Sequence, residues 1–98
     1  MSRNLKFMFR LYVAGDTQNS AQARTNLAVI CRDHLPKQHE IEIVDVLKEP
    51  QRALTDGIFM TPTLVKVGPA PAQKIVGTLN QTETVLHALG LRMEIVAA

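Results

Sequence analysis

The chain has 98 residues, of which 46% are hydrophobic and only 4% aromatic, and its formal net charge is +2 at pH 7. This length suits one domain and is too short for two, so we expect a single domain (1–98) with its core over about 5–91 and a short tail over 92–98. The basic residues are scattered, which argues against nucleic acid as a partner. No apolar run approaches the ~18 residues of a membrane-spanning helix.

Cysteine usage and the start of the chain bear on the compartment. The one cysteine, Cys31, excludes an intramolecular disulfide and is typical of a reducing environment. The apolar residues near the beginning are interrupted by Arg10, so this segment does not resemble a secretory signal peptide. We therefore expect a soluble cytoplasmic domain with no membrane partner.

The first half of the chain predicts a strand, a helix and a second strand. Residues 5–14 (LKFMFRLYVA) are rich in the side chains that strands prefer. After a polar turn, in which Asn19 or Ser20 supplies the helix cap, apolar residues recur at helical spacing over 20–35, and Pro36 ends the helix. Residues 40–47 (EIEIVDVL) form the second strand, with Asp45 expected as a hydrogen-bonded structural carboxylate at its end.

The second half predicts a short helix, two strands and a final helix. Residues 50–55 form the short helix, with Pro50 in its first turn. Strands follow over 63–67 and 73–79, separated by a Pro-rich turn. Asn80 with Glu83 is typical of a capping box, and Gly90 is a suitable helix stop. Residues 93–96 offer strand material for the tail.

These elements predict a mixed four-stranded sheet. The first strand-helix-strand unit should be parallel, and the last two strands, joined by a short turn, should be antiparallel. This order, βαβαββα, is thioredoxin-like. Pro62 cannot donate to a sheet ladder, so the entrance of the third strand is a suitable place for it. The Thr61-Pro62-Thr63 step is similar to the cis-proline step of thioredoxin-like folds, which makes Pro62 a cis-proline candidate.

The thiol chemistry of thioredoxins is missing from this scaffold. The end of the first strand, where a nucleophilic cysteine would stand, contains none. Cys31 lies on the apolar side of the first helix, where we expect a small buried hydrophobe. Ser20 is the alternative group at that helix start. The histidines do not cluster at ligand spacing, so we expect no metal and no cofactor.

Four motifs in register resemble the KaiB family, the circadian clock proteins of bacteria, over about 7–91. They are 11–20 (LYVAGDTQNS), 44–51 (VDVLKEPQ), 61–64 (TPTL) with Lys66, and 69–71 (PAP) leading into 75–77 (IVG). The resemblance implies a non-enzymatic protein that binds the hexameric ATPase and kinase KaiC, in a complex that captures KaiA. It also implies fold switching between a thioredoxin-like monomer, which binds KaiC, and an often tetrameric state with the order βαββααβ.

Two positions of the fold-switch region depart from the family pattern. Ala88 stands where the family commonly has Gly, and Gly90 where it has Asp. Because Gly-to-Ala in a helix interior favours helix by up to about 1 kcal/mol, we expect a bias toward the thioredoxin-like state. Short edge strands and the tail permit dimers or tetramers.

Partner-binding residues are carried over by position. Lys66 matches a basic family position, and Lys74 stands where the family commonly has Arg. Gln73 and Gln22 stand at two further positions where the family commonly has Arg. Arg24 is near Gln22 in sequence but lies about 200° round the helix from it, so we do not expect Arg24 to substitute directly for that Arg. If the family resemblance is set aside, the residues alone indicate that Lys66 and Lys74 are solvated charges at a strand edge. The acidic tail that is typical of cyanobacterial clock members of the family is missing. A KaiC-linked role in a stress or timing response is therefore an alternative to a role in a circadian oscillator.

Two other functions stay open from the sequence. One is a thiol-free, glutathione-type or small-ligand protein that uses Ser20 and the backbone at Thr61 beside Pro62. The other is a sensor domain related to the N-terminus of a clock-output histidine kinase, which would make such a kinase the partner.

Overall fold

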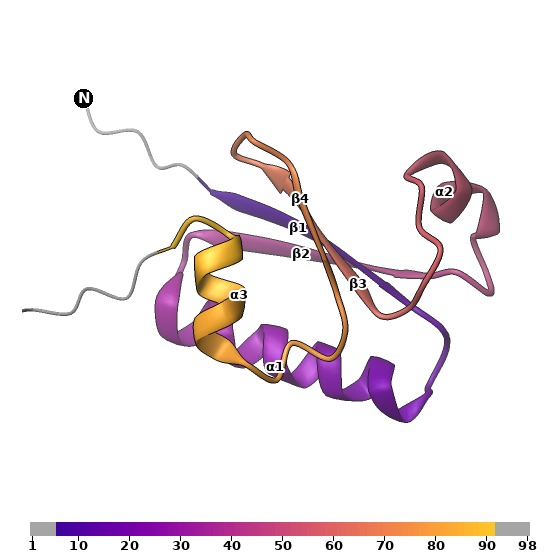
Figure 1. The fold of residues 1–98 in the computed structure, drawn as a ribbon, viewed down its shortest axis with the longest axis horizontal. Helices are drawn as coiled ribbons and strands as arrows, with labels where there is room; N and C mark the ends of the chain where they lie inside the picture. Colours follow the sequence, from indigo (N-terminus) through magenta and orange to yellow (C-terminus); the bar gives the residue numbers. More distant parts are fainter. Residues whose placement is uncertain (1–5, 92–98) are drawn as a thin grey trace, which may run out of the picture.

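The computed structural model describes residues 6–91, which form four strands and three helices (Figure 1). In chain order these are β1 (Phe7–Val13), α1 (Gln18–His34), β2 (His39–Asp45), α2 (Pro50–Thr55), β3 (Thr63–Gly68), β4 (Gln73–Val76) and α3 (Thr82–Ala88). No helix in this part of the chain has the length and apolar character to cross a membrane.

The strands form one sheet in the order β2-β1-β3-β4. β1 and β2, which α1 connects, are parallel, whereas β3 is antiparallel to both β1 and β4. The thioredoxin-like order βαβαββα predicted from the sequence is therefore confirmed, and it is this arrangement, not βαββααβ, that the described residues adopt. The predicted strand material at 93–96 lies outside them.

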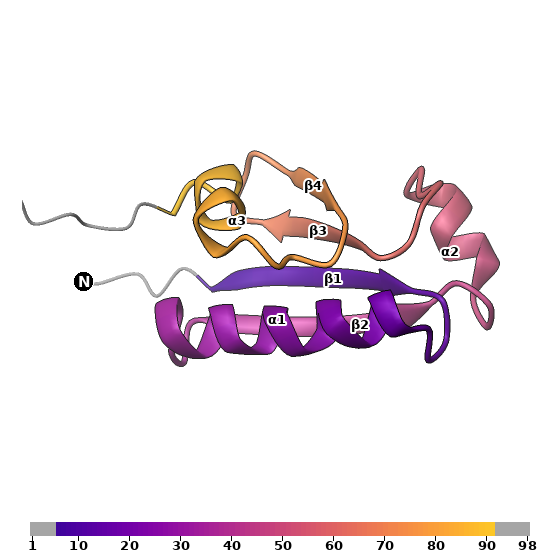
Figure 2. The ribbon, with the colours of Figure 1, turned by 60° about the horizontal axis from the view of Figure 1, so that its bottom comes forward.

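One face of the sheet is covered by α1 and α3 (Figures 1 and 2). The main core forms here, because alternate residues of β1 and β3 point toward these helices. Its largest fully buried members are aliphatic, as expected from the few aromatic residues: Leu11, Leu27, Leu64, Leu86 and Leu89.

The opposite face is covered only at one end, by α2 (Figure 2). A smaller cluster forms there from Tyr12, Val44, Ala53, Ile58 and Val65. Beyond it the face is open, and apolar side chains such as Met8 and Val67 are 40% and 47% exposed. The two faces of the sheet therefore differ. Two helices cover one face, whereas on the other face only α2 and the loop that follows it pack over one end of the sheet.

The predicted cap of α1 is wrong. Thr17 is the N-cap residue, and Ser20 lies inside the first turn, where it is fully buried. Its Oγ accepts hydrogen bonds from the Ala14 amide (3.1 Å) and the Thr17 hydroxyl (2.8 Å). Ser20 thus connects the end of β1 to α1 instead of satisfying free helix amides, a tertiary role that the local sequence does not reveal.

At the other end of the chain, two predicted boundaries are wrong and one is confirmed. β4 ends at Val76, because Gly77 (φ 122°) and Leu79 (φ 63°) turn the backbone, and α3 is capped by Gln81 instead of Asn80. Gly90 (φ 78°) does stop α3. Its amide donates to His87 O and the Leu91 amide to Leu86 O, the two bonds of a Schellman motif.

Candidate functional site

The loop between α2 and β3 carries two exposed large apolar side chains, one of them the most exposed large apolar side chain of the described residues. Phe59 is 89% exposed and Met60 63% exposed; we call these two residues the ridge. Leu47 and Leu54, on the neighbouring segment and on α2, are 72% and 68% exposed. Apolar side chains concentrated in one region of a surface commonly mark a site of protein–protein contact.

Two shallow hollows flank the ridge. One, of about 160 Å³, is lined by Gly57, Thr63, Lys74 and Val76 as well as ridge residues. The other, of about 170 Å³, lies toward α2 and includes Val46, Ala53 and Thr61. A cavity of about 150 Å³ holds benzene, so each hollow has room for one apolar side chain of a partner.

The ridge is anchored to β3 and β4 on its C-terminal side. The Thr63 hydroxyl donates to Met60 O (2.5 Å), and Pro62 O accepts from the Gly77 amide (2.9 Å). Pro62 is buried, and the Thr61–Pro62 peptide bond is cis. The segment that leads from the ridge into the sheet is therefore fixed.

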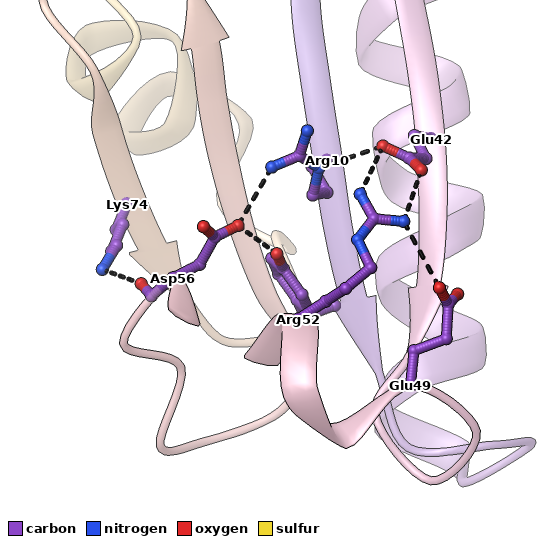
Figure 3. Close-up of polar contacts among 7 residues, drawn as sticks. Arg10, Glu42, Glu49, Arg52, Asp56 and Lys74 are labelled. Atoms are coloured by element: carbon purple, nitrogen blue, oxygen red, sulfur yellow. Dashed lines mark hydrogen bonds and ion pairs between the residues drawn. The ribbon is translucent and has the colours of Figure 1, made fainter. Parts of the chain in front are cut away.

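A network of charged groups joins α2 to the open face of the sheet (Figure 3). Arg52 of α2 makes a two-pronged ion pair with Glu42 of β2, with Nη1–Oε2 and Nη2–Oε1 distances of 2.7 and 3.0 Å. Arg10 of β1 donates from Nε to the same carboxylate (3.0 Å). Hydrogen bonds from Arg52 and Arg10 hold the pKa of Glu42 at about 2.

Asp56, directly after α2, is the second centre of this network. Its Oδ2 accepts from Arg10 Nη1 (2.9 Å) and from the Tyr12 hydroxyl, and its backbone carbonyl accepts from Lys74 Nζ (2.5 Å) (Figure 3). The hydrogen bond from Tyr12 lowers the pKa of the Asp56 carboxyl, with a further contribution from Arg10. Burial, supplemented by the bond to Asp56, raises the pKa of Tyr12.

Lys66 does not lie where the strand-edge interpretation places it. β3 is an interior strand, and Lys66 is only 4% exposed. Its Nζ donates to Leu89 O (3.3 Å) and lies 5.7 Å from the centre of the Phe7 ring. The prediction of a solvated edge charge is therefore wrong for Lys66, because the side chain turns toward α3 instead of water.

The other predicted partner-binding residues are dispersed. Gln73 pairs with Lys66 on the helix-covered face, whereas Lys74 pairs with Val65 and faces the ridge side. Gln22 and Arg24 are exposed on α1. Of the five, Lys74 is the one that lines a hollow beside the ridge.

Sequence reasoning missed the ridge and Asp56. The available signal was a pair of large apolar residues, Phe59 and Met60, in a short loop before a proline. Such a pair is compatible with burial as well as with exposure, and the sequence alone does not decide between them.

The two side chains that the sequence offered for thiol-type chemistry, Cys31 and Ser20, are both buried. Cys31 is buried, as predicted, and burial raises the pKa of its thiol to about 11. Ser20 is fully buried and its oxygen is already bonded, so it does not face a ligand. Residues 6–91 contain no group of three or more His, Cys, Asp or Glu side chains able to hold a metal ion. Asp45, as predicted, accepts backbone amides at its strand end.

Comparison with known structures supports the fold. The N-terminal domain of SasA from Synechococcus elongatus has a TM-score of 0.73 at 18% identity, covering 97% of this chain and 93% of that one. Mitochondrial thioredoxin 3 from Saccharomyces cerevisiae has a TM-score of 0.70 at 17% identity, covering 89% and 80%. At these identities the likeness shows a shared thioredoxin-like fold alone.

Comparison with known sequences identifies the family. The circadian clock protein KaiB3 of Synechocystis sp. is 43% identical over 86 residues, which is 88% of this chain and 84% of that protein. The circadian clock oscillator protein KaiB of Prochlorococcus marinus is 42% identical over 94 residues, covering 96% and 80%. Residues 10–91 match the KaiB domain. The chain therefore belongs to the KaiB family.

Proposed function

We propose that this chain is a non-catalytic KaiB-type regulator that binds a KaiC-type ATPase ring through the ridge and modulates the phosphorylation or signalling output of that ring. The family membership and the names of the relatives, which are clock proteins, support a regulatory role in a clock or a related timing or stress response. The observation that carries the proposal is the exposure of Phe59 and Met60 beside two hollows.

The chemistry of the ridge suits a protein partner. Aromatic residues and Met are enriched in protein interfaces, and a few such anchors supply most of the binding energy. A Phe that is 89% exposed gains nothing from its own fold, so its apolar surface is free to be buried by a partner. The hollows then accept one partner side chain on each side of the ridge.

A glutathione-type role is less well supported, because Ser20 is buried within the fold. Capture of KaiA or of a histidine kinase by the assembled complex, and dimers or tetramers of the free chain, remain parts of the proposal that rest on the family resemblance. The exposed edge strand β2 is compatible with self-association.

The test is co-sedimentation with the KaiC-type ATPase of the same organism, in ATP and in ADP. We expect nucleotide-dependent co-sedimentation of the wild-type chain, and loss of at least about tenfold in affinity for Phe59→Ala, as for an interface anchor. The matched control is Val29→Ala, which removes an exposed apolar side chain (39%) from α1. The sedimentation of the free chain reports its oligomeric state in the same run. No complex in either nucleotide at tens of micromolar, or equal loss in both variants, would refute the proposal.

A further inference from the structure

We propose that Arg10, Asp56 and Lys74 are positioning residues that fix the ridge for its partner; this inference rests on the proposed function and concerns the regulation of the same site. Arg10 and Asp56 line neither hollow beside the ridge, so they need not contact the partner, whereas Lys74 also lines one hollow. Their contacts at Asp56 hold the turn at 56–57 (Figure 3), which precedes the ridge in the chain.

Asp56 receives bonds from two strands at once. It is the C-cap residue of α2. Arg10 and Tyr12 of β1 donate to its side chain, and Lys74 of β4 donates to its backbone carbonyl. Since β1 and β4 lie on either side of β3 in the sheet, these bonds place the end of α2 over the sheet from both sides.

Gly57 allows the ammonium group of Lys74 to reach the Asp56 carbonyl oxygen, because it has no Cβ. Its φ of 68° is a left-handed conformation that glycine adopts at little cost. A Cβ added at position 57 would lie 3.3 Å from Lys74 Nζ, tighter than an ordinary contact. The turn therefore has both the backbone freedom and the space that the Lys74–Asp56 bond requires.

The conformation of the ridge depends on this turn, because the ridge side chains are themselves mostly exposed and make few packing contacts. Ile58, the residue between the turn and the ridge, is 7% exposed in the cluster under α2, and its amide donates to Ala53 O (2.8 Å). Phe59 and Met60 themselves lie mostly in solvent. A surface that is held in its binding conformation loses less entropy on association, so loosening the turn should weaken binding without removing any contact.

The environment makes these ion pairs more effective than ordinary surface pairs. The side chains of Arg10 and Asp56 are 26% and 30% exposed, so solvent and salt screen them less. The Lys6–Glu40 pair, on the same face, has exposures of 52% and 54% and belongs to the class of pairs that contribute little. It is a natural control.

The experiment compares Asp56→Ala and Lys74→Met with Glu40→Gln. Amide hydrogen exchange of the free chain is measured first, and then affinity for the KaiC-type ring in the nucleotide that supports binding. We expect exchange at the Gly57 and Ile58 amides, which donate to Leu54 O and Ala53 O, to rise by about tenfold or more in the two test variants, since local opening becomes easier, while the amides of α1 and β1 keep the wild-type rate. The affinity should also fall in Asp56→Ala, whose side chain lines neither hollow, and Glu40→Gln should change neither the exchange nor the affinity.

Three outcomes overturn the inference. They are unchanged exchange at the Gly57 and Ile58 amides, an equal rise throughout the sheet, which would mean general destabilisation, and a selective rise in Asp56→Ala without loss of affinity. Failure of the proposed function is a separate result. If wild-type protein does not bind the ring, or if Phe59→Ala binds normally, the ridge is not the binding surface, whatever the exchange shows.

Discussion

The ammonium group of Lys66 lies at the C-terminal end of α3, where its Nζ donates to the carbonyl oxygen of Leu89 across 3.3 Å. The last carbonyls of a helix carry partial negative charge and lack partners within the helix. The Phe7 ring, 5.7 Å from Nζ, adds a favourable cation–π contact. A basic residue at this position therefore fastens α3 to the sheet.

Removing this group should loosen α3. Lys66→Met keeps much of the volume but leaves the Leu89 carbonyl without its partner, which should lower the free energy of unfolding by ~1–3 kcal/mol. Urea unfolding measures the change, and amide exchange should rise chiefly in α3. Lys48→Met, at an exposed site, is the control. A Lys66→Met chain as stable as wild type would show that the buried charge contributes nothing net.

The Glu42 ion pairs should make stability depend on pH in the acid range. The pKa of Glu42 is lowered from 4.5 to about 2 in the fold, so its contribution is fully present above about pH 5 and is lost as the pH falls toward 2. The urea midpoints of wild type and Glu42→Gln should therefore converge between these values. The difference should be modest, since the side chain is 48% exposed. A gap that stays constant with pH would contradict this account.

The double variant Glu42→Gln/Arg52→Gln tests the assignment of that pair. Because both single changes remove the same two-pronged bond, their effects at pH 7 should add to more than the effect of the double variant. Simple additivity would mean that Arg10, and not Arg52, is the partner that matters to Glu42.

The Cys31 thiol should be nearly inert in the folded chain. It is fully buried and the pKa of the thiol is raised to about 11, so very little reactive thiolate is present at pH 8. We expect slow reaction with a disulfide reagent in native buffer and fast reaction in urea, followed by absorbance of the released thiolate. A native rate equal to that in urea would show that the helix opens readily or that the thiol is accessible.

Local patterns predicted the elements well where propensity and packing agree. α2 spans 50–55 as predicted, with Pro50 in its first turn. Gly90 ends α3, also as predicted. The N-cap residue of α3 is Gln81 and not the predicted Asn80. The prediction failed at Ser20 because a tertiary contact occupies its hydroxyl, which accepts from the Ala14 amide and the Thr17 hydroxyl. The prediction of a solvated charge at Lys66 failed for the same reason. A lysine in a strand is expected to be exposed, and only the position of α3 beside the strand shows that its side chain is buried.

The candidate site was less accessible to sequence reasoning. Its polar network joins β1, β2, β4 and α2, so its members come from positions as distant as Arg10 and Lys74. Neither spacing nor composition shows that these side chains meet. The resemblance directed attention to basic residues, whereas the exposed apolar pair Phe59 and Met60 became visible only when the open face of the sheet was known.

The end of α3 offers a test of fold bias. Ala88 is the last residue of α3 and not an interior one, so its advantage over Gly falls below the ~1 kcal/mol of a helix interior. Gly90 has a φ of 78° and no atom within 4 Å of an added Cβ. Gly90→Asp would thus meet no clash, but would hold a non-glycine residue in a left-handed conformation at a cost of ~1–2 kcal/mol.

The double variant Ala88→Gly/Gly90→Asp should therefore destabilise the thioredoxin-like state by roughly 2 kcal/mol. Two folds of one sequence that differ by only a few kcal/mol exchange populations under such a change, so we expect a second set of NMR signals with strand-like shifts in the C-terminal segment, together with larger assemblies in sedimentation. Ala21→Gly, which weakens the exposed side of α1, is the control and should give one set of signals. Strand-like shifts throughout the C-terminal segment of the wild-type chain would contradict the bias toward the thioredoxin-like state, because the alternative would then already predominate without the two substitutions.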